Sequence, residues 1–562
     1  MKDYTSSIAN IRFSRDARTL VSSFLAVIML IFIIFTGPKL GLTGTDITLC
    51  AVYFAVFYFA GLLTFFSQKG TGKMDIVLFF GAGLAAVVYV RTALMYYQSR
   101  DYNIFLSQWL SQMRQYSGIS ALAADIGDYT APYRCFLFIL SRFNGNDMML
   151  IKMFSMCFDL VGAYYMMKLV ELRNKNVGVK ALAFLLTLAA PTVFLNSAMW
   201  GQCDMIYAAF CLASLYYALT DRSRLSVIMF SVAFAFKLQA VFFLPALGLL
   251  VLIRKVRWRD LLWFPAVQVI AALPSVLAGQ NIVKALTVYL HQTGEYSDMH
   301  LNAPSIWRFI GDNKNVNSSN FGMLAIMLTG LAVLAVIYLC YANIKKLDDR
   351  RLVNAAFIMS LMIPFLLPRM HDRYFFLADV MSILYFFYNK KRWYVPCGVI
   401  FASYVSYAHY LIQMSDINQL ITAAVLLVIL AICLRKLIDE LLNAKEVPCI
   451  TVQSDSVDGV NTASAANDTA DVKTADAAVD LSQLGGESAE DDETVSDTNA
   501  SDESDRTDGN DEQAADKDSN KSNSDKKMLF SFTDSEKRQS ATTKQPLNFA
   551  GASTSHYSAE ED

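Results

Sequence analysis

The chain has 562 residues, of which 54% are hydrophobic and 17% are charged, and its formal net charge at pH 7 is -2. Charged side chains make up about a quarter of a soluble domain, so this composition argues against one and favours a protein that uses the lipid bilayer as its solvent. The chain has no overall excess of basic residues, which makes a nucleic acid an unexpected partner.

Apolar segments recur from residue 19 to residue 434, each near the roughly 20 residues that a helix needs to cross the bilayer. The segments are continuous rather than alternating, and this predicts helices instead of a closed barrel of strands. We therefore expect an all-α polytopic membrane protein with about fourteen transmembrane helices. The expected spans are 19–37, 46–66, 75–95, 148–170, 179–198, 204–220, 224–238, 240–254, 261–279, 321–343, 352–368, 373–389, 393–412 and 417–434.

The two expected spans on either side of Lys237 are short, which predicts a broken or re-entrant hairpin there. The basic N-terminus and the first apolar segment also suit a secretory signal, but no small-residue cleavage site follows, so we interpret that segment as an uncleaved span. The predicted parts are a cytoplasmic N-terminus at 1–18, a membrane domain at 19–440 and a tail at 445–562.

Lys and Arg side chains gather in alternate loops between the expected spans, and such loops usually face the cytoplasm. This pattern predicts a multi-pass protein of the plasma membrane with both termini in the cytoplasm. The extracytoplasmic side then receives two large loops, 96–147 and 280–320, and several short ones. Most polar groups that could carry chemistry fall on this side, so we expect the active site to be extracytoplasmic.

The apolar content falls sharply after about residue 445, where Ser, Asp and Ala dominate. A stretch such as 491–511 cannot bury enough surface to offset the entropy lost on ordering. We therefore expect residues 445–562 to form a disordered, acidic cytoplasmic tail. Solvation and spacing would explain this tail, and recruitment of partners is the alternative.

No motif predicts a cofactor or a metal site. The nine cysteines lie mainly within apolar segments, where a thiol behaves as a small hydrophobic group. His291, Glu295, Asp298 and His300 in the second large loop match a metal-binding set in composition but not in spacing. We therefore expect no bound cofactor, and the sequence leaves metal dependence open.

Asp101 follows the third expected span, at the start of the first large loop. A carboxylate there could act as a general base toward an acceptor hydroxyl. The alternative is a solvated acid paired with its neighbour Arg100. Asp125 and Asp128 in the same loop compete for the role of base, and Asp128 lies in a proline-containing turn that could instead shape a sugar or acceptor pocket.

A second polar group, Trp200, Gln202 and Asp204, lies between two expected spans. The indole could be a headgroup anchor and Asp204 a helix cap, whereas recognition of sugar hydroxyls would account for both polar side chains and for stacking on the indole. Lys237, followed by Gln239, has no carboxylate nearby in the sequence. A phosphate would satisfy its ammonium, and snorkelling to the interface is the alternative.

A third group places positive charge on the predicted extracytoplasmic side, where the positive-inside pattern predicts few basic residues. It consists of Arg369, His371 and Arg373. Such donors converge well on a phosphate and would stabilise the charge that a departing polyprenyl phosphate develops. Asp372 could instead neutralise one of the arginines in a structural network.

As a set, these elements resemble the GT-C superfamily of membrane glycosyltransferases, and bacterial relatives of GPI mannosyltransferase II in particular. The resemblance extends over about residues 75–390. It implies a fold of GT-C type and inverting transfer of a sugar, with mannose as the family-level expectation, from a polyprenyl-phosphate donor. The similar elements are 99–102, 127–133, Asn196 with 200–204, 237–239, 301–307 and 371–374.

The resemblance also implies roles for individual residues. Asp101 would be the catalytic base. The donor phosphate would be held by His371 and Arg373, assisted by Lys237, and the concentration of positive charge adds Arg369 to this expected phosphate site. The side chains expected to contact the sugar or the acceptor are Arg100, Asp128, Tyr133, Trp200, Gln202, Asp204 and Gln239.

The resemblance leaves the acceptor open between a glycolipid, a cell-wall glycan and a protein. A transporter or flippase of lipid-linked saccharides is the rival function, because the same basic side chains could bind a phosphate in transit. Transporters commonly show paired repeats around a site at the midplane. No repeat is evident and the polar groups gather at one rim, so the enzyme is favoured. Relatives often carry Glu at the position of Asp372, so this acid receives no direct role.

Overall fold

The structure is a computed structural model that describes residues 15–289, 298–310, 319–414 and 416–443. All of them belong to one compact unit, Met1–Asp458. The predicted tail at 445–562 lies outside the described residues, as does most of the predicted cytoplasmic segment 1–18. Both therefore stay predictions.

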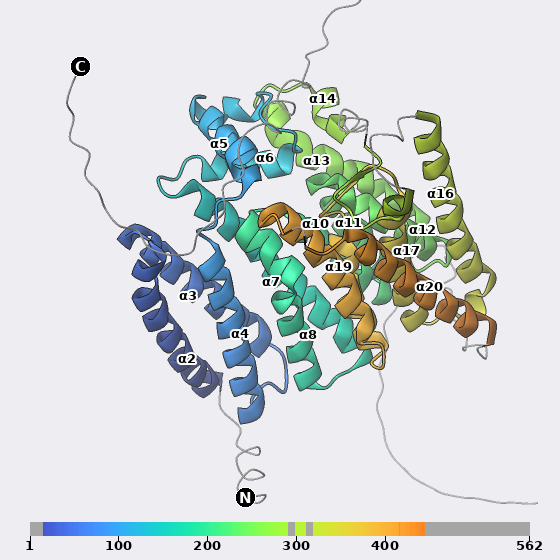
Figure 1. The fold of residues 1–562 in the computed structure, drawn as a ribbon, viewed down its shortest axis with the longest axis horizontal. Coiled ribbons are helices and arrows are strands. Elements are labelled where there is room, and N and C mark those ends of the chain that lie inside the picture. Colours follow the sequence, from blue (N-terminus) through green and yellow to red (C-terminus); the bar gives the residue numbers. More distant parts are fainter. Residues whose placement is uncertain (1–14, 290–297, 311–318, 415, 444–562) are drawn as a thin grey trace, which may run out of the picture. The chain divides into compact units, whose positions relative to one another are not determined.

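The described part is built almost entirely from helices (Figure 1). The α-helices are α2 (Arg15–Thr36), α3 (Gly44–Phe66), α4 (Met74–Leu94), α5 (Ser107–Arg114), α6 (Ala131–Leu140), α7 (Asp147–Arg173), α8 (Val177–Ala189), α9 (Pro191–Phe194), α10 (Asp204–Leu219), α11 (Ser223–Phe236), α12 (Leu244–Leu252), α13 (Trp263–Leu277), α14 (Ile282–Leu286), α16 (Ser319–Ala342), α17 (Asp349–Leu366), α18 (Phe376–Tyr388), α19 (Tyr394–Leu411) and α20 (Gln419–Asn443).

Shorter turns of 3₁₀- or π-helix join these elements. They are η1 (Pro38–Leu40), η2 (Tyr102–Leu106), η3 (Gly118–Leu122), η4 (Leu195–Trp200), η5 (Leu238–Phe243), η6 (Trp258–Leu262), η7 (Ile306–Ile310) and η9 (Ile344–Lys346). Within the described ranges the strands are β1 (His300–Leu301) and β2 (Met370–His371), which pair in parallel. This architecture confirms the predicted all-α fold class.

Six helices in the described part of the chain are long and apolar enough to cross a membrane, or seven if the bent pair formed by α8 and Pro191–Trp200 is one span. The six are α3, α4, α7, α16, α20 and the segment Trp258–Leu277. The other predicted spans also coincide with helices, but these are shorter or more polar. The protein is thus an all-α membrane protein, and a count of about fourteen crossings stays a prediction.

Proline and glycine interrupt the helices next to the polar segment that includes Trp200. Ala190 adopts an extended conformation because Pro191 follows it, and the helix axis bends by 50° there. The π-helix η4 then ends at Gly201, whose φ of 80° is readily adopted only without a side chain. These breaks place Trp200 and Gln202 in a turn between two helices instead of on one helix face.

Helix α7 packs against both α8 and α10, and α10 packs in turn against α11. Gly162 permits the close contact of α7 with α10, because a Cβ there would lie only 2.4 Å from the Sδ of Met205. Side chains of α7 join two clusters of buried apolar residues, one with α10, α17 and α18 and one with α2, α3, α4 and α8. Figure 1 shows α2, α3 and α4 grouped beside α7 and α8.

An ion pair joins α4 to α7 inside this packing. Arg91 Nη2 lies 3.1 Å from Asp159 Oδ2, and neither side chain is exposed. The Oγ of Ser197 in η4 donates a hydrogen bond to the same oxygen at 2.7 Å. The pair therefore ties α4 to the broken helix that ends at Trp200.

Removing one partner of this pair should destabilise the protein more than removing both. Asp159→Leu leaves a buried guanidinium without its carboxylate, which costs about 3–5 kcal/mol. We expect Asp159→Leu to lower the melting temperature of the detergent-purified protein more than the double variant Arg91→Leu/Asp159→Leu does. A double variant that melts no higher than Asp159→Leu would contradict this account of charge compensation.

Candidate active site

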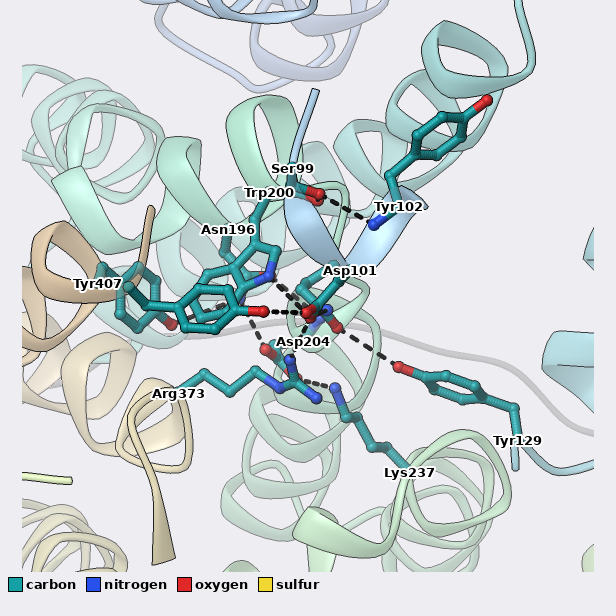
Figure 2. A network of polar contacts seen from close by, with 12 residues as sticks. Ser99, Asp101, Tyr102, Tyr129, Asn196, Trp200, Asp204, Lys237, Arg373 and Tyr407 are labelled. Carbon is teal, nitrogen blue, oxygen red and sulfur yellow. Dashed lines mark hydrogen bonds and ion pairs between the residues drawn. The ribbon is translucent and has the colours of Figure 1, made fainter. Parts of the chain in front are cut away.

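Asp101 accepts hydrogen bonds from four side chains (Figure 2). Its Oδ2 accepts from Trp200 Nε1 at 2.9 Å, from Gln202 Nε2 at 2.7 Å and from Arg373 Nη1 at 3.1 Å. Its Oδ1 accepts from the hydroxyl of Tyr410. The Asp101 side chain is only 14% exposed, so the protein rather than water solvates this carboxylate.

The four donors come from three separate parts of the chain, all close to ends of helices. Asp101 follows α4 and directly precedes η2. Trp200 and Gln202 flank the turn between η4 and α10, Arg373 lies between β2 and α18, and Tyr410 lies in the last turn of α19. Helix ends that are far apart in sequence therefore converge on one carboxylate.

Sequence reasoning missed Tyr410, because this residue lies within the apolar run of an expected span. A weak signal was present. Tyr404, Tyr407 and Tyr410 recur at a spacing of three residues toward the end of that span, next to His409. Side chains three residues apart lie on the same side of a helix, and their hydroxyls can donate hydrogen bonds to a buried acid.

Asp101 is held in its ionised form. Burial opposes its ionisation, but the Arg373 guanidinium and the hydrogen bonds from Tyr410 and Trp200 outweigh burial and keep the pKa of this carboxyl below its ordinary value. An ionised carboxylate can accept a proton. Its Oδ2 already has three donors and its Oδ1 has one, so an incoming hydroxyl would approach Oδ1, beside Tyr410 or in its place.

Asp204 forms a second, more deeply buried ion pair. Its Oδ1 contacts the ammonium of Lys237, and its Oδ2 accepts a hydrogen bond from Asn196 Nδ2 at 2.7 Å. Figure 2 shows this pair beside the group around Asp101. The same amide nitrogen of Asn196 lies 3.4 Å from the hydroxyl of Tyr407.

Aromatic rings hold the Trp200 indole in one orientation. Tyr410 stacks on it with a centroid distance of 4.8 Å, and Tyr407 meets it edge-on at 5.1 Å. The guanidinium carbon of Arg373 lies 5.5 Å from its ring centroid. With rings on two sides and a cation nearby, the indole N–H has a fixed direction toward Asp101.

The second large loop is attached to the segment that carries Arg373. Strand β1 of this loop pairs in parallel with β2, and the backbone N–H of Arg369 donates to the Met299 carbonyl at 2.7 Å. Arg369 has a φ of 62°, which side-chain-bearing residues adopt infrequently. The pairing therefore fixes the course of the backbone that leads to Arg373.

Of the two residues before Arg373, His371 is uncharged near neutral pH and Asp372 is only partly ionised. Burial and the Arg373 guanidinium lower the pKa of His371 to about 3, so its imidazole is neutral. Burial raises the pKa of Asp372 to about 7, against the pull of Arg373. Asp372 forms no ion pair within the described residues, and the carboxylate that neutralises Arg373 is Asp101.

Several alternatives drawn from the sequence are wrong. Trp200 is 1% exposed and is therefore not a headgroup anchor. Asp204 does not cap α10, whose N-cap is Cys203, and it pairs with Lys237 instead. Lys237 is buried and does not snorkel.

The alternative that Asp101 is a solvated acid paired with Arg100 is also wrong, because its carboxylate pairs with Arg373 instead. The competing acid Asp125 is exposed and pairs with Lys284. These contacts leave Asp101 as the acid at the centre of the network.

The remaining predicted residues surround this network. Tyr133 is buried, and its ring centroid lies 4.3 Å from that of Tyr129, whose hydroxyl lies 3.4 Å from Gln202 Oε1. The Oε1 of Gln239 is buried without a hydrogen-bond partner in the described part. Asp128 is exposed.

A cavity of about 690 Å³ lies beside the network, which is within the usual range for a ligand pocket. Tyr410 lines it and also contacts Asp101, whereas Asp101 itself does not line it, so Tyr410 connects the cavity to the carboxylate. Its polar lining consists of Tyr97, Gln98, Arg100, Asn103, Asn302, His409, Tyr410 and Gln413. Amides and phenols of this kind suit a ligand rich in hydroxyl groups.

Among the residues that the structure describes, no group of three or more His, Cys, Asp or Glu side chains could hold a metal ion. In the second large loop, His291 and Glu295 lie outside the described residues.

These features define a class: an all-α membrane protein with a buried, ionised carboxylate and an arginine beside a polar cavity. A family model, glycosyltransferase family 87, matches residues 137–368. The match supports a membrane glycosyltransferase of the GT-C type. A specific relation to GPI mannosyltransferase II stays a prediction. No curated protein matches the chain.

The matched range contains only part of the network. Trp200, Gln202, Asp204 and Lys237 lie inside residues 137–368, whereas Asp101, Arg373 and Tyr410 lie outside it. The family match therefore supports the class of reaction, and the contacts around Asp101 come from the structure.

Removing the Tyr410 hydroxyl should raise the pKa of Asp101, since this donor stabilises the ionised form. A hydrogen bond to a charged group contributes about 1.5–3 kcal/mol, and about 1.4 kcal/mol corresponds to one pH unit. For Tyr410→Phe we expect the acidic limb of the kcat/KM profile to move upward by about one pH unit. Activity would then be lost at a higher pH on acidification.

Tyr404→Phe is the matched control, because the Tyr404 hydroxyl on the same helix has no hydrogen bond to Asp101. Its acidic limb should coincide with that of the wild type. An acidic limb that does not move in Tyr410→Phe would contradict the assigned role of this hydroxyl.

Proposed function

We propose that the chain is an inverting glycosyltransferase that moves a sugar, with mannose as the first candidate, from a polyprenyl-phosphate donor to an acceptor hydroxyl outside the plasma membrane. One observation carries the proposal: Asp101 and Arg373, from distant loops, meet beside a polar cavity. Inverting transfer from a phosphate needs a base for the acceptor and a cation for the leaving group. This pair supplies both.

In the proposed reaction an acceptor hydroxyl enters from the cavity and takes the place of one donor on Asp101. Tyr410 is the donor that gives way, because it lines the cavity and is the sole donor to Oδ1 in the described part. As the hydroxyl oxygen attacks the anomeric carbon, its proton passes to Asp101. The bond from that carbon to the phosphate oxygen breaks on the opposite face, which inverts the configuration.

Arg373 is the proposed main partner of the departing phosphate. Its Nη1 holds Asp101, while its Nε is buried without a hydrogen-bond partner in the described residues. One planar guanidinium can therefore hold the base and a phosphate oxygen together. Lys237 is already neutralised by Asp204 and His371 is neutral, so these two contribute hydrogen bonds more than net charge.

Because Trp200 and the residues beside it are buried, we propose different roles for them than the sequence suggested. The indole and the side chains of Gln202 and Asp204 are at most 5% exposed, which leaves little surface on which a sugar could stack. We assign Trp200 and Gln202 to orienting Asp101. The acceptor is assigned to the cavity, where Arg100 forms part of the lining.

Asp101→Asn keeps the shape of the side chain and removes its capacity to take a proton. We expect transfer to fall about 10²–10⁴-fold. The measurement is transfer of radiolabelled mannose from polyprenyl-phosphate mannose, by purified protein in lipid vesicles, to the glycolipid, cell-wall and protein fractions counted separately.

Asp125→Asn is the matched control, and it should keep activity close to that of the wild type because this acid is exposed and pairs with Lys284. Undiminished transfer by Asp101→Asn would refute the assignment of the base. If the wild type moved intact labelled lipid between leaflets without releasing the sugar, the flippase would be favoured instead.

Arg373→Lys keeps a positive charge but loses the planar fork that reaches both Asp101 and the phosphate. We expect kcat to fall about 10²–10³-fold, the usual effect of removing one donor from a transition-state oxyanion. Arg142→Lys serves as the control, since the hydrogen bonds of Arg142 within the described ranges all go to backbone carbonyls of the first large loop. Equal kcat values for Arg373→Lys and Arg142→Lys would contradict the role of Arg373.

A further inference from the structure

Lys152 is a buried lysine in a membrane-spanning helix. It lies in α7, one of the six helices able to cross a membrane, and is 1% exposed. No carboxylate pairs with it in the part of the chain that the structure describes. Its Nζ donates instead to two backbone carbonyls, of Met95 at 3.0 Å and of Tyr97. A charge in such a place is costly and calls for a specific role.

The two carbonyls lie where the chain leaves α4 on its way to Asp101. Met95 is the C-cap of α4, where the carbonyls of the last turn have no helical partner and carry partial negative charge. The Lys152 ammonium satisfies this helix end and the carbonyl of Tyr97 with one group. It therefore fixes the position and direction of the segment from Met95 to Asp101.

The aliphatic stem of Lys152 contacts the other side of the network. A Cβ built on Gly201 would lie 3.6 Å from Lys152 Cγ and 3.7 Å from its Cε, so the stem packs against this turn. Gly201 separates Trp200 from Gln202, two of the donors to Asp101.

A further hydrogen bond links the two sides. Ser99 Oγ, two residues before Asp101, donates to the Trp200 carbonyl at 2.7 Å. Lys152 thus lies between the segment that carries the base and the turn that carries two of its donors. It has no hydrogen bond to Asp101, and its contact with the cavity lining is the one to the backbone carbonyl of Tyr97.

We propose that Lys152 is a positioning residue for Asp101. Its ammonium anchors the end of α4 and its stem supports the turn at Gly201, so that the carboxylate and its donors keep their relative positions. The inference rests on the proposed transferase function, since it concerns the base of that reaction. It assigns a catalytic consequence to a residue in the second turn of α7, outside the polar loops themselves.

An apolar side chain at position 152 could not hold the end of α4 in this way, because it has no hydrogen-bond donor. Methionine would fill a similar volume, but it would leave the Met95 and Tyr97 carbonyls without a donor in a medium of low dielectric. The segment would then shift to find other partners. A misplacement of about 1 Å at a reacting group can lower the rate by about 10²-fold.

The test compares Lys152→Met with Lys152→Arg in the mannose transfer assay, using polyprenyl-phosphate mannose as the probe. We expect kcat of Lys152→Met to fall about 10²-fold, with KM for the donor within about twofold of the wild type. Lys152→Arg keeps the charge and the donors, so it should recover most of the lost kcat. Because a smaller folded fraction would also lower the apparent kcat at an unchanged KM, each kcat is calculated per mole of folded protein, taken from the monodisperse peak in size-exclusion chromatography.

Lys180→Met is the matched control. Lys180 is also a buried lysine, at 4% exposure, but it pairs with Glu171, which keeps Lys168 as a second partner. Its kcat should equal that of the wild type. If Lys152→Met has the kcat of Lys180→Met, or if Lys152→Arg is as slow as Lys152→Met, the positioning role is refuted.

If Lys152→Met does not yield folded protein, Lys152→Arg is compared with Lys152→Gln, which is shorter and uncharged. A higher kcat for the arginine variant would support the proposal, and equal values would overturn it. A wild type that transfers no sugar at all would reject the proposed function itself. That outcome is distinct from normal transfer in the Lys152 variants, which would reject only the present inference.

Discussion

The structure depends on one electrostatic constraint: the carboxylate of Asp101 is nearly buried and must have its charge compensated by the protein. Arg373 provides the opposite charge, and Trp200, Gln202 and Tyr410 provide the remaining hydrogen bonds. The donors lie in or next to the ends of helices. The breaks in the chain beside Trp200 and Arg373 let these two side chains reach Asp101.

The same interruptions explain how a protein in an apolar solvent can carry a polar site at all. The Pro191 bend, the Gly201 turn and the strand pairing beside Arg369 replace helical hydrogen bonds by contacts within the protein. Irregular backbone at such a place is tolerated when protein groups satisfy it. The buried pair of Arg91 with Asp159 and the cation Lys152 then hold the helices on which the site depends.

Sequence reasoning reached the helical fold class because continuous apolar runs are a direct physical signature of a bilayer. It also singled out Asp101, Trp200 and Arg373, since polar side chains at the ends of apolar runs stand out. It could not pair Lys237 with Asp204, which is 33 residues away, nor predict that β1 joins β2. It passed over Tyr410 and Lys152, because a tyrosine or a single lysine within an apolar run does not change the pattern.

The central claim is that Asp101 and Arg373 act as one unit in the reaction, and a double-mutant cycle tests it most directly. The kcat/KM for mannose transfer would be measured for Asp101→Asn, Arg373→Gln and the double variant. If the two side chains act together, the double variant should be about as slow as the slower single variant. Losses that multiply, as expected for independent sites, would contradict the account.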